Sequence, residues 1–212
     1  MNYPVSLNLR GKTCVIVGGG AVAARKIAGL LDTGASIVVM SPTLDESLRA
    51  TASCNKLHWL QQRWNPGSLL PLAPSLVFAA TDNAKANREV AEEARQLGAL
   101  VNVADDGQAG DFSNMAVLRR PPLQVALDSG GASPALVRWL RDRIASCIRE
   151  EHATLAHWLG DLRPGLHTVI PKQERRQAFY REVLESDVLA LLGSDKEEEA
   201  RRLMNSMLEE SR

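Results

Sequence analysis

The chain has 212 residues, of which 45% are hydrophobic and 24% charged, with 25 Lys and Arg against 25 Asp and Glu. A chain of this size and composition can bury one good core and a second, smaller one. Because the charges balance, no overall field recruits nucleic acid or an anionic membrane, and neither partner is expected.

The three cysteines exclude two further classes of protein. Cys14, Cys54 and Cys147 are odd in number and have no Cys-x-x-Cys spacing, which argues against a disulfide framework and against a zinc site. Residues 64–81 carry no charge but are interrupted by prolines, so no membrane span is expected there, and residues 1–10 lack the apolar core of a signal peptide. We expect a cytoplasmic protein.

The N-terminal elements begin with Pro4–Leu9, whose alternation of apolar and polar residues predicts an edge strand. A buried strand is predicted at Thr13–Val17, followed by a Gly-rich turn and a helix over Ala21–Leu31. In this turn, Gly18 can take unusual backbone angles and Gly20 lets the main chain approach a pyrophosphate.

The helix after this turn completes a candidate phosphate site. N–H groups at a helix start point toward a bound anion, and the helix dipole favours negative charge there. We therefore assign cofactor binding to Gly18, Gly20, Ala21 and Val22. The alternative is a Gly-rich turn that serves packing alone.

The next strand, Ser36–Met40, runs into Ser41, Pro42 and Thr43 instead of the Asp or Glu that commonly holds the adenosine ribose. Ser41, Thr43 or the local backbone would hold the diol, unless Ser41–Pro42 is only a turn. The nearest following cation, Arg49, is too distant to be assigned to a 2′-phosphate, which favours NAD over NADP.

Further strands are predicted at Leu57–Leu60, Leu76–Ala80 and Leu100–Ala104, with a helix over Ala84–Leu97. Strands that alternate with helices predict an α/β fold with a Rossmann-type parallel sheet. Ligands of such sheets bind at the carboxyl ends of the strands, where Thr81 could contact the cofactor.

Three aspartates follow these strands. Asp82 is expected to be the N-cap of the following helix. Asp105 and Asp106 lie at a strand end beside the expected cofactor site, where one of them could act as a general base. The alternative for this pair is a polar turn that ends at Gly107.

The second half of the chain is predicted to contain a strand at Leu123–Leu127 and a helix at 133–149 with an apolar stripe. Between them, Ser133 is the predicted N-cap, and Ser129 and Gly130 belong to a second Gly-rich turn. This turn either binds a substrate carboxylate, through Ser129, Gly130 and Ser133, or only caps the helix.

The last sixty residues are predicted to be helical, with helices at 152–162, 171–184 and 196–209 separated at 163–165 and 193–194. His152 and His157 are five residues apart and fall on different helix faces. The histidines therefore form no metal-ligand pattern, and no metal site is assigned.

Taken together, the motifs resemble one family, the precorrin-2 dehydrogenase and sirohydrochlorin ferrochelatase module of sirohaem synthase, including its stand-alone forms. The resemblance is carried in order by Pro4–Lys12, Gly18–Lys26, Ala80–Asp82, Val101–Asp105 and Ser129–Pro134. The segment Asp111–Ala116 departs from the family pattern, and this departure either alters how a macrocycle is seated or leaves only the dehydrogenase activity.

This resemblance implies a Rossmann domain at 1–112, a central dimerisation region at 113–150 and a small all-helical C-terminal domain at 151–212, working as a homodimer. It implies NAD-dependent oxidation of precorrin-2 to sirohydrochlorin, with ferrous iron insertion to give sirohaem as a second activity. The family's essential aspartate falls on Asp105 and leaves Asp106 as an extra neighbour.

In this family the tetrapyrroles precorrin-2 and sirohydrochlorin are the substrates, with ferrous iron as a co-substrate of the second activity. Their carboxylates suit the helix start at Ser133 and cations such as Arg119, Arg120 and Arg138, which could equally be ordinary surface charges. Two alternatives stay open: a non-catalytic NAD-binding redox sensor or tetrapyrrole carrier, and a dehydrogenase of an unrelated small substrate.

Overall fold

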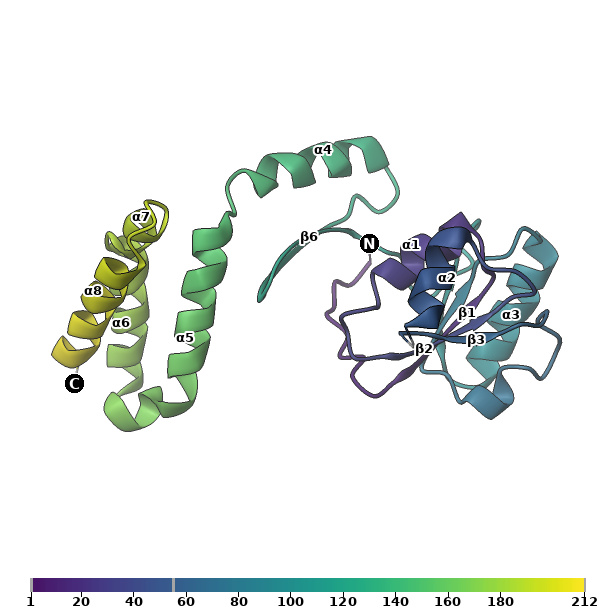
Figure 1. Cartoon of the computed structure of the whole chain (residues 1–212), viewed down its shortest axis with the longest axis horizontal. Coiled ribbons are helices and arrows are strands. Elements are labelled where there is room, and N and C mark those ends of the chain that lie inside the picture. Colours follow the sequence, from purple (N-terminus) through teal and green to yellow (C-terminus); the bar gives the residue numbers. More distant parts are fainter. Residues whose placement is uncertain (1, 55, 212) are drawn as a thin grey trace. The chain divides into compact units, whose positions relative to one another are not determined.

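A computed structural model describes residues 2–54 and 56–211 of the chain. These residues divide into two compact units, one ending at Asn114 and the other beginning at Met115. The first unit contains a sheet with helices, and the second contains a pair of strands followed by helices (Figure 1).

The first unit contains a parallel sheet with strand order β3-β2-β1-β4-β5 in the described residues. Its strands are β1 (Thr13–Val17), β2 (Ser36–Met40), β3 (His58–Leu60), β4 (Leu76–Ala79) and β5 (Leu100–Val103). Its helices are α1 (Ala21–Ala28), α2 (Glu46–Ser53) and α3 (Ala84–Gln96), with the short 3₁₀ turn η1 (Leu70–Leu72). The order reverses at β1, which is where doubly wound sheets bind ligands.

Two apolar layers cover the sheet. Cys14, Ile16 and Phe78 face one layer, which α1 joins through Ile27 and α2 through Leu48. On the other face, α3 supplies a stripe of small residues and Val90 to the second layer. Figure 1 shows α1 and α2 on one side of the sheet and α3 on the other. Strands buried on both faces explain why these segments are almost wholly apolar.

The alternating segment at the N-terminus was predicted wrongly. Pro4–Leu9 has no strand pairing, and only Leu9 packs against the core, whereas Val5 and Leu7 are exposed. An alternating pattern describes a segment that fits a half-buried strand, but a strand forms only where a neighbouring edge accepts its hydrogen bonds. The described edge strands, β3 and β5, do not pair with it.

The second unit begins with the antiparallel pair β6 (Ala116–Arg120) and β7 (Leu123–Leu127), followed by α4 (Pro134–Ala145), which packs on β6. The apolar stripe predicted through Leu136, Leu140, Ile144 and Cys147 is not the buried side of this helix. Val137 is its buried residue, whereas Leu136 and Leu140 are exposed, as is Trp139 outside the stripe.

The rest of this unit is helical, with α5 (Glu150–Val169), α6 (Gln173–Glu185), α7 (Val188–Leu192) and α8 (Glu197–Glu210). These helices enclose one core that includes Trp158, Leu166 and Phe179. The predicted break at 163–165 is wrong, because α5 continues through Pro164. Residues on both sides of Pro164 are buried in the same core, and this packing offsets the hydrogen bond that proline removes.

The fold class predicted from the sequence is therefore confirmed: a Rossmann-type parallel sheet is followed by a small second region and a helical C-terminal part. Among the described residues, no helix combines the length and the apolar content needed to cross a membrane.

Candidate functional site

The carboxyl ends of β1, β2 and β4 bring three loops into contact. The Gly18 amide donates to the Met40 carbonyl at 3.0 Å, and the Asp45 amide donates to the Gly19 carbonyl at 2.7 Å. On the other side, the Ala80 amide donates to the Val17 carbonyl at 2.8 Å. These bonds fix the glycine turn between the loops that follow β2 and β4.

Two glycines of this turn leave no room for a side chain. Gly18 has φ +121°, and a Cβ added there would lie 2.2 Å from the Ala80 carbonyl oxygen. A Cβ on Gly19 would lie 2.2 Å from the Thr43 carbonyl oxygen. Gly20 has no heavy atom within 4 Å of such a Cβ, so its outer side is open. Sequence reasoning singled out Gly18 and Gly20 and missed Gly19, whose need for glycine comes from the β2 loop.

The start of α1 offers free donors beside Gly20. Gly20 is the N-cap, no described side chain caps it, and the first turn holds no acidic residue. Ala21 and Val22 are exposed. Because the first N–H groups of a helix have no partner within it, this end suits a phosphate.

The loop after β2 offers backbone and hydroxyl groups but no free carboxylate. Ser41 is buried, and its carbonyl accepts the Trp59 indole N–H at 2.9 Å, whereas Pro42 and Thr43 are exposed. The next acid, Asp45, caps α2. Hydrogen bonds from the side chain and then the backbone of Ser47 lower its pKa.

The loop after β4 corrects one assignment. The N-cap of α3 is Asn83, not Asp82: the Asn83 side chain accepts from the amides of Lys85 and Ala86. The Thr81 hydroxyl donates to the Oδ1 of Asn87 at 2.7 Å. Thr81 is thus held inward, and Asp82 stays exposed.

The two aspartates after β5 have different surroundings. Asp105 is exposed, and its Oδ1 accepts the Asn87 carboxamide N–H at 2.8 Å. Asp106 turns back on its own loop and accepts from the amides of Gln108 and Ala109 at 3.1 and 3.2 Å. Asp105 is therefore tied to the Thr81 loop through Asn87, and Asp106 stabilises a turn.

The first part of the segment Asp111–Ala116, which departs from the family pattern, is held to the first unit by hydrogen bonds and a ring contact. The Asn102 carboxamide donates to the Phe112 carbonyl at 2.8 Å, and Phe112 stacks edge-on against Phe78 at 5.5 Å between ring centroids. Asn114 accepts from the Lys26 ammonium at 2.8 Å. Burial, followed by the nearby Arg25 charge, lowers the pKa of Lys26. Asn114 thus supplies an acceptor for a partly buried cation.

In the second unit, the turn before α4 satisfies much of its own hydrogen bonding. The Ser129 hydroxyl oxygen accepts the Ser133 amide at 3.0 Å, and the Ser133 hydroxyl oxygen accepts the Leu136 amide at 3.3 Å. Ser133 is thus the N-cap, as predicted, and Gly130 takes a φ of +60°. Of the arginines considered for carboxylate binding, Arg120 pairs with Glu150 at 3.0 Å.

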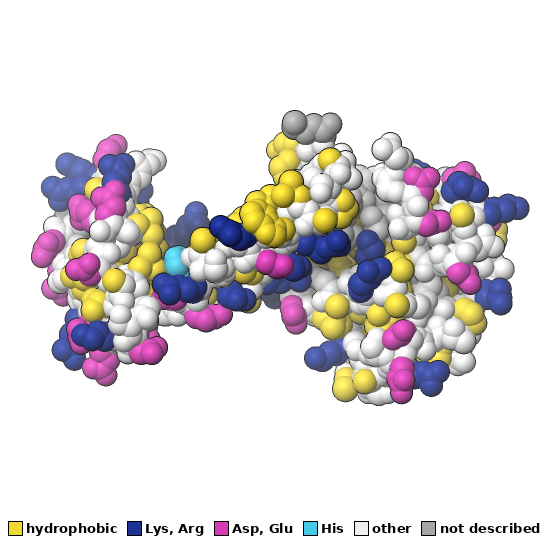
Figure 2. Space-filling model, turned by 90° about the horizontal axis from the view of Figure 1, so that it is seen from above, with side chains coloured by type: hydrophobic (Ala, Val, Ile, Leu, Met, Phe, Trp, Pro, Cys, Tyr) yellow, Lys and Arg dark blue, Asp and Glu magenta, His cyan; other side chains and the backbone are white. Residues whose placement is uncertain are grey.

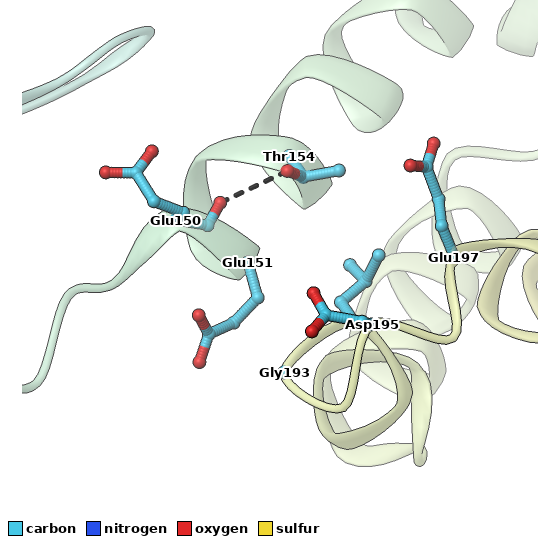
Figure 3. A pocket seen from close by; sticks show the side chains of 7 residues that line it. Glu150, Glu151, Thr154, Gly193, Asp195 and Glu197 are labelled. Atoms are coloured by element: carbon cyan, nitrogen blue, oxygen red, sulfur yellow. Dashed lines mark hydrogen bonds between the residues drawn. The ribbon is translucent and has the colours of Figure 1, made fainter.

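A hollow in the second unit has a different character (Figure 3). It lies between the start of α5 and the connection from α7 to α8, and is lined by Glu150, Glu151, Thr154, Leu192, Gly193, Asp195 and Glu197. Its carboxylates repel phosphates and carboxylate-rich ligands, so it suits neither half of the predicted chemistry. Across the described ranges, no three His, Cys, Asp or Glu side chains are grouped to hold a metal ion.

Three family models match successive parts of the chain. The model described as putative NAD(P)-binding matches residues 5–116, the sirohaem biosynthesis protein central model matches 120–146, and the sirohaem synthase dimerisation region matches 152–208. The model named for dimerisation thus matches 152–208, which follows the segment 113–150 for which the family resemblance implied that role.

Curated relatives match along almost the whole chain. A siroheme synthase of Chromobacterium violaceum is 37% identical over 206 residues, which are 97% of this chain and 43% of that protein. A siroheme synthase of Nitrosococcus oceani is 36% identical over 99% of this chain and 44% of its own length. The chain thus spans less than half the length of these relatives.

A solved structure named SirC, precorrin-2 dehydrogenase, matches with a TM-score of 0.76 and 24% identity, covering 97% of this chain and all of that one. At this identity the likeness concerns the fold. The resemblance to the sirohaem synthase module is confirmed by the family models, one of which covers more than half of the chain. The chain belongs to the putative NAD(P)-binding family, with the central and dimerisation segments of sirohaem biosynthesis proteins following its dinucleotide-binding part.

Proposed function

We propose that the chain is an NAD-dependent dehydrogenase that oxidises precorrin-2 to sirohydrochlorin. The observation that carries this proposal is the position of Asp105, an exposed carboxylate at the rim that carries the glycine turn, held at 2.8 Å by a buried carboxamide. The curated relatives are named siroheme synthases, and the structural neighbour is named a precorrin-2 dehydrogenase.

The residues at the rim fit a dinucleotide. The open side of Gly20 and the uncapped start of α1 would receive the pyrophosphate, with Ala21 and Val22 donating from the backbone. Ser41, Pro42 and Thr43 would line the ribose, and Thr81 would lie beside the nicotinamide half. β2 ends without a carboxylate, and the nearest following cation, Arg49, lies on helix α2 and is not assigned to a 2′-phosphate. We therefore propose NAD in preference to NADP.

Dehydrogenation removes a hydride and a proton from the substrate. A bound NAD⁺ would supply the hydride acceptor for this reaction, with NADH as its reduced product. Asp105 would take the proton on its Oδ2, because Oδ1 is occupied by Asn87. In the second unit, taken by itself, the turn with Ser129, Gly130 and Ser133 would offer donors to carboxylates, with the Ser129 hydroxyl free to donate because its oxygen is the acceptor in the turn.

The main test is turnover. Wild-type protein incubated with precorrin-2 and NAD⁺ is expected to produce NADH and the absorption spectrum of sirohydrochlorin. In a separate binding measurement, its Kd is expected to be lower for NAD⁺ than for NADP⁺. Asp105→Ala is expected to lower kcat by about 100-fold or more while NAD⁺ affinity stays within about twofold, because the carboxylate accepts a proton and does not hold the cofactor.

The matched control is Asp106→Ala, which removes the neighbouring carboxylate that stabilises a turn. Its kcat is expected to stay within a few-fold of wild type. Tight binding of NAD⁺ and tetrapyrrole without turnover by a folded wild-type sample would instead identify a redox sensor or carrier. Full activity of Asp105→Ala would remove this residue from the mechanism.

Ferrous iron insertion is the second activity to be measured on the same sample. The same Asp105 carboxylate could accept a pyrrole proton as the metal enters, and iron would be a substrate here. Loss of both activities in Asp105→Ala would assign one base to both steps. A cytoplasmic, reducing location also belongs to this proposal, since Cys54 and Cys147 are exposed free thiols.

A further inference from the structure

Asn87 is the buried polar residue on which the rim depends. It lies in the second turn of α3, is 0% exposed, and makes all its side-chain bonds with two residues. Its Oδ1 accepts from the Thr81 amide at 3.0 Å and from the Thr81 hydroxyl at 2.7 Å. Its Nδ2 donates to the Thr81 carbonyl at 3.2 Å and to the Oδ1 of Asp105 at 2.8 Å. Its carboxamide is therefore fully satisfied.

The orientation of this carboxamide is dictated by its partners. A backbone N–H can only donate, so the Thr81 amide must meet the oxygen of Asn87. The NH₂ group is then turned toward the Thr81 carbonyl and the Asp105 carboxylate, both of which can only accept. No rotated form of the side chain satisfies these groups.

The bond to Asp105 is additional to what the loop requires. Three of the four bonds close the Thr81 loop onto α3, which is sufficient reason for a buried asparagine. The fourth reaches out to an exposed carboxylate on the next strand. Within the described chain, this bond leaves the Oδ2 of Asp105 without a hydrogen-bond partner, so one oxygen is held and the other is available.

Resting on the proposed function, we propose that Asn87 is a positioning residue for the dehydrogenation. Its Nδ2 fixes the Oδ1 of Asp105, so that Oδ2 faces the proton to be removed, and its Oδ1 fixes Thr81 at the cofactor side. One side chain thus holds the general base and the loop next to the cofactor in a single register. Its contribution is to orientation, since it does not itself contact the reacting atoms.

Among the described residues, Asn87 is the side chain that donates to the Asp105 carboxylate, and the charged residues of the adjoining segments make other contacts or are exposed. Asp106 is engaged by its own turn, and Asp82 lies exposed on the Thr81 loop. On α3, Lys85 pairs with Glu89 at 3.7 Å. A neutral donor to a carboxylate stabilises its charged form, which is the form that accepts a proton.

Two substitutions separate positioning from loop support. Asn87→Asp keeps the oxygen that accepts two of the three bonds from the Thr81 loop, but it replaces Nδ2, which donates to the Thr81 carbonyl and to Asp105, with a carboxylate oxygen. Asn87→Ala removes both functions. Each is expected to lower kcat by about 10- to 100-fold, because the base is misoriented, while KM and the Kd of NAD⁺ change less than about threefold.

The control is Asn83→Ala, which removes the cap of α3 and costs about 1 kcal/mol of stability without touching Asp105. Its kcat is expected to stay near that of wild type. Wild-type kcat in Asn87→Asp would overturn the proposal, because support of the Thr81 loop alone would then explain this asparagine.

A second readout does not depend on turnover. The ¹³C NMR signal of the Asp105 carboxyl, assigned by its loss in Asp105→Asn, is recorded at one fixed pH in the folded proteins. Its chemical shift is expected to move in Asn87→Ala and in Asn87→Asp, because both variants remove the hydrogen bond to Oδ1. Wild-type protein that does not oxidise precorrin-2 contradicts the proposed function alone. An unmoved carboxyl signal in both variants contradicts the role of Asn87.

Discussion

At the scale of single residues, the rim is built by neighbours that are distant in sequence. The Thr43 carbonyl leaves no room for a side chain at Gly19, and the Asp105 carboxylate accepts a hydrogen bond from Asn87 on helix α3. The Gly-rich motif is visible in the sequence, but the reason for each glycine in it differs. Gly18 and Gly19 serve the packing of loops, whereas Gly20 leaves space open.

This difference predicts that two alanine substitutions affect different quantities, one the stability of the protein and the other its affinity for NAD⁺. Gly19→Ala forces a Cβ to within 2.2 Å of a backbone oxygen and is expected to lower the free energy of unfolding by about 3 kcal/mol. Gly20→Ala has open space and a φ of −87°, so the protein is expected to keep its stability. Its Kd for NAD⁺ should rise at least tenfold, because the methyl group occupies space proposed for the pyrophosphate.

Denaturant unfolding and calorimetric titration of both variants measure these effects. Undiminished NAD⁺ affinity in Gly20→Ala would show that the pyrophosphate lies elsewhere. Undiminished stability in Gly19→Ala would show that the β2 loop can move away.

At the scale of elements, tertiary packing decides where the helices end. α5 runs through Pro164 because Trp158 before it and Leu166 after it are buried in the same core. The sequence predicted a break from Pro164–Gly165, which is the usual meaning of such a pair. Gly165 is exposed in the interior of this helix, and a Cβ there would meet nothing within 4 Å, so no close contact requires a glycine at this position.

Gly165→Ala is therefore expected to raise the free energy of unfolding by about 0.5–1 kcal/mol, since alanine has the higher helix propensity and its Cβ meets nothing within 4 Å. Gly193→Ala is the matched contrast, because its Cβ would lie 3.3 Å from the carboxylate of Glu151. Its gain should be smaller or reversed. Thermal unfolding of both variants compares them, and a loss of stability in Gly165→Ala would mean that α5 needs a distortion at this point.

At the scale of the whole molecule, the chain consists of two compact units with separate cores. We propose a division at 1–112, 113–150 and 151–212, and a homodimer in which 113–150 carries the contact. The exposed apolar side chains of α4 support this assignment, and Figure 2 shows hydrophobic side chains (yellow) beside Lys and Arg (dark blue) on the surface. The alternative is 152–208, the part matched by the dimerisation-region model.

Two equally exposed side chains distinguish these alternatives. Trp139 on α4 is 55% exposed and Leu184 on α6 is 56% exposed. Trp139→Asp is expected to raise the dimer dissociation constant at least tenfold, because a charge is placed in an apolar contact, whereas Leu184→Asp leaves it unchanged. Sedimentation equilibrium measures both. The reverse result would assign the dimer contact to the helical segment.

Much of the fold could be predicted from the sequence, because strongly apolar runs and helix periodicity are local signals. The strand Leu123–Leu127 and the cap at Ser133 were predicted at their observed positions. Asn87 also carries a signal in the sequence, because it shares the buried helix face of Val90, Ala91 and Ala94 and begins that face with a polar side chain. A polar residue on the buried face of a helix must find partners there.

By itself, the sequence determined the α/β class, the glycine turn as a dinucleotide motif and the family resemblance, because each follows from residue types at short spacing. The tertiary structure decided that Pro4–Leu9 is unpaired, that Asn83 and not Asp82 caps α3, and that Asn87 joins Thr81 to Asp105. These outcomes depend on which groups from distant segments meet, and hydrogen bonds between such groups leave no periodic pattern in the chain.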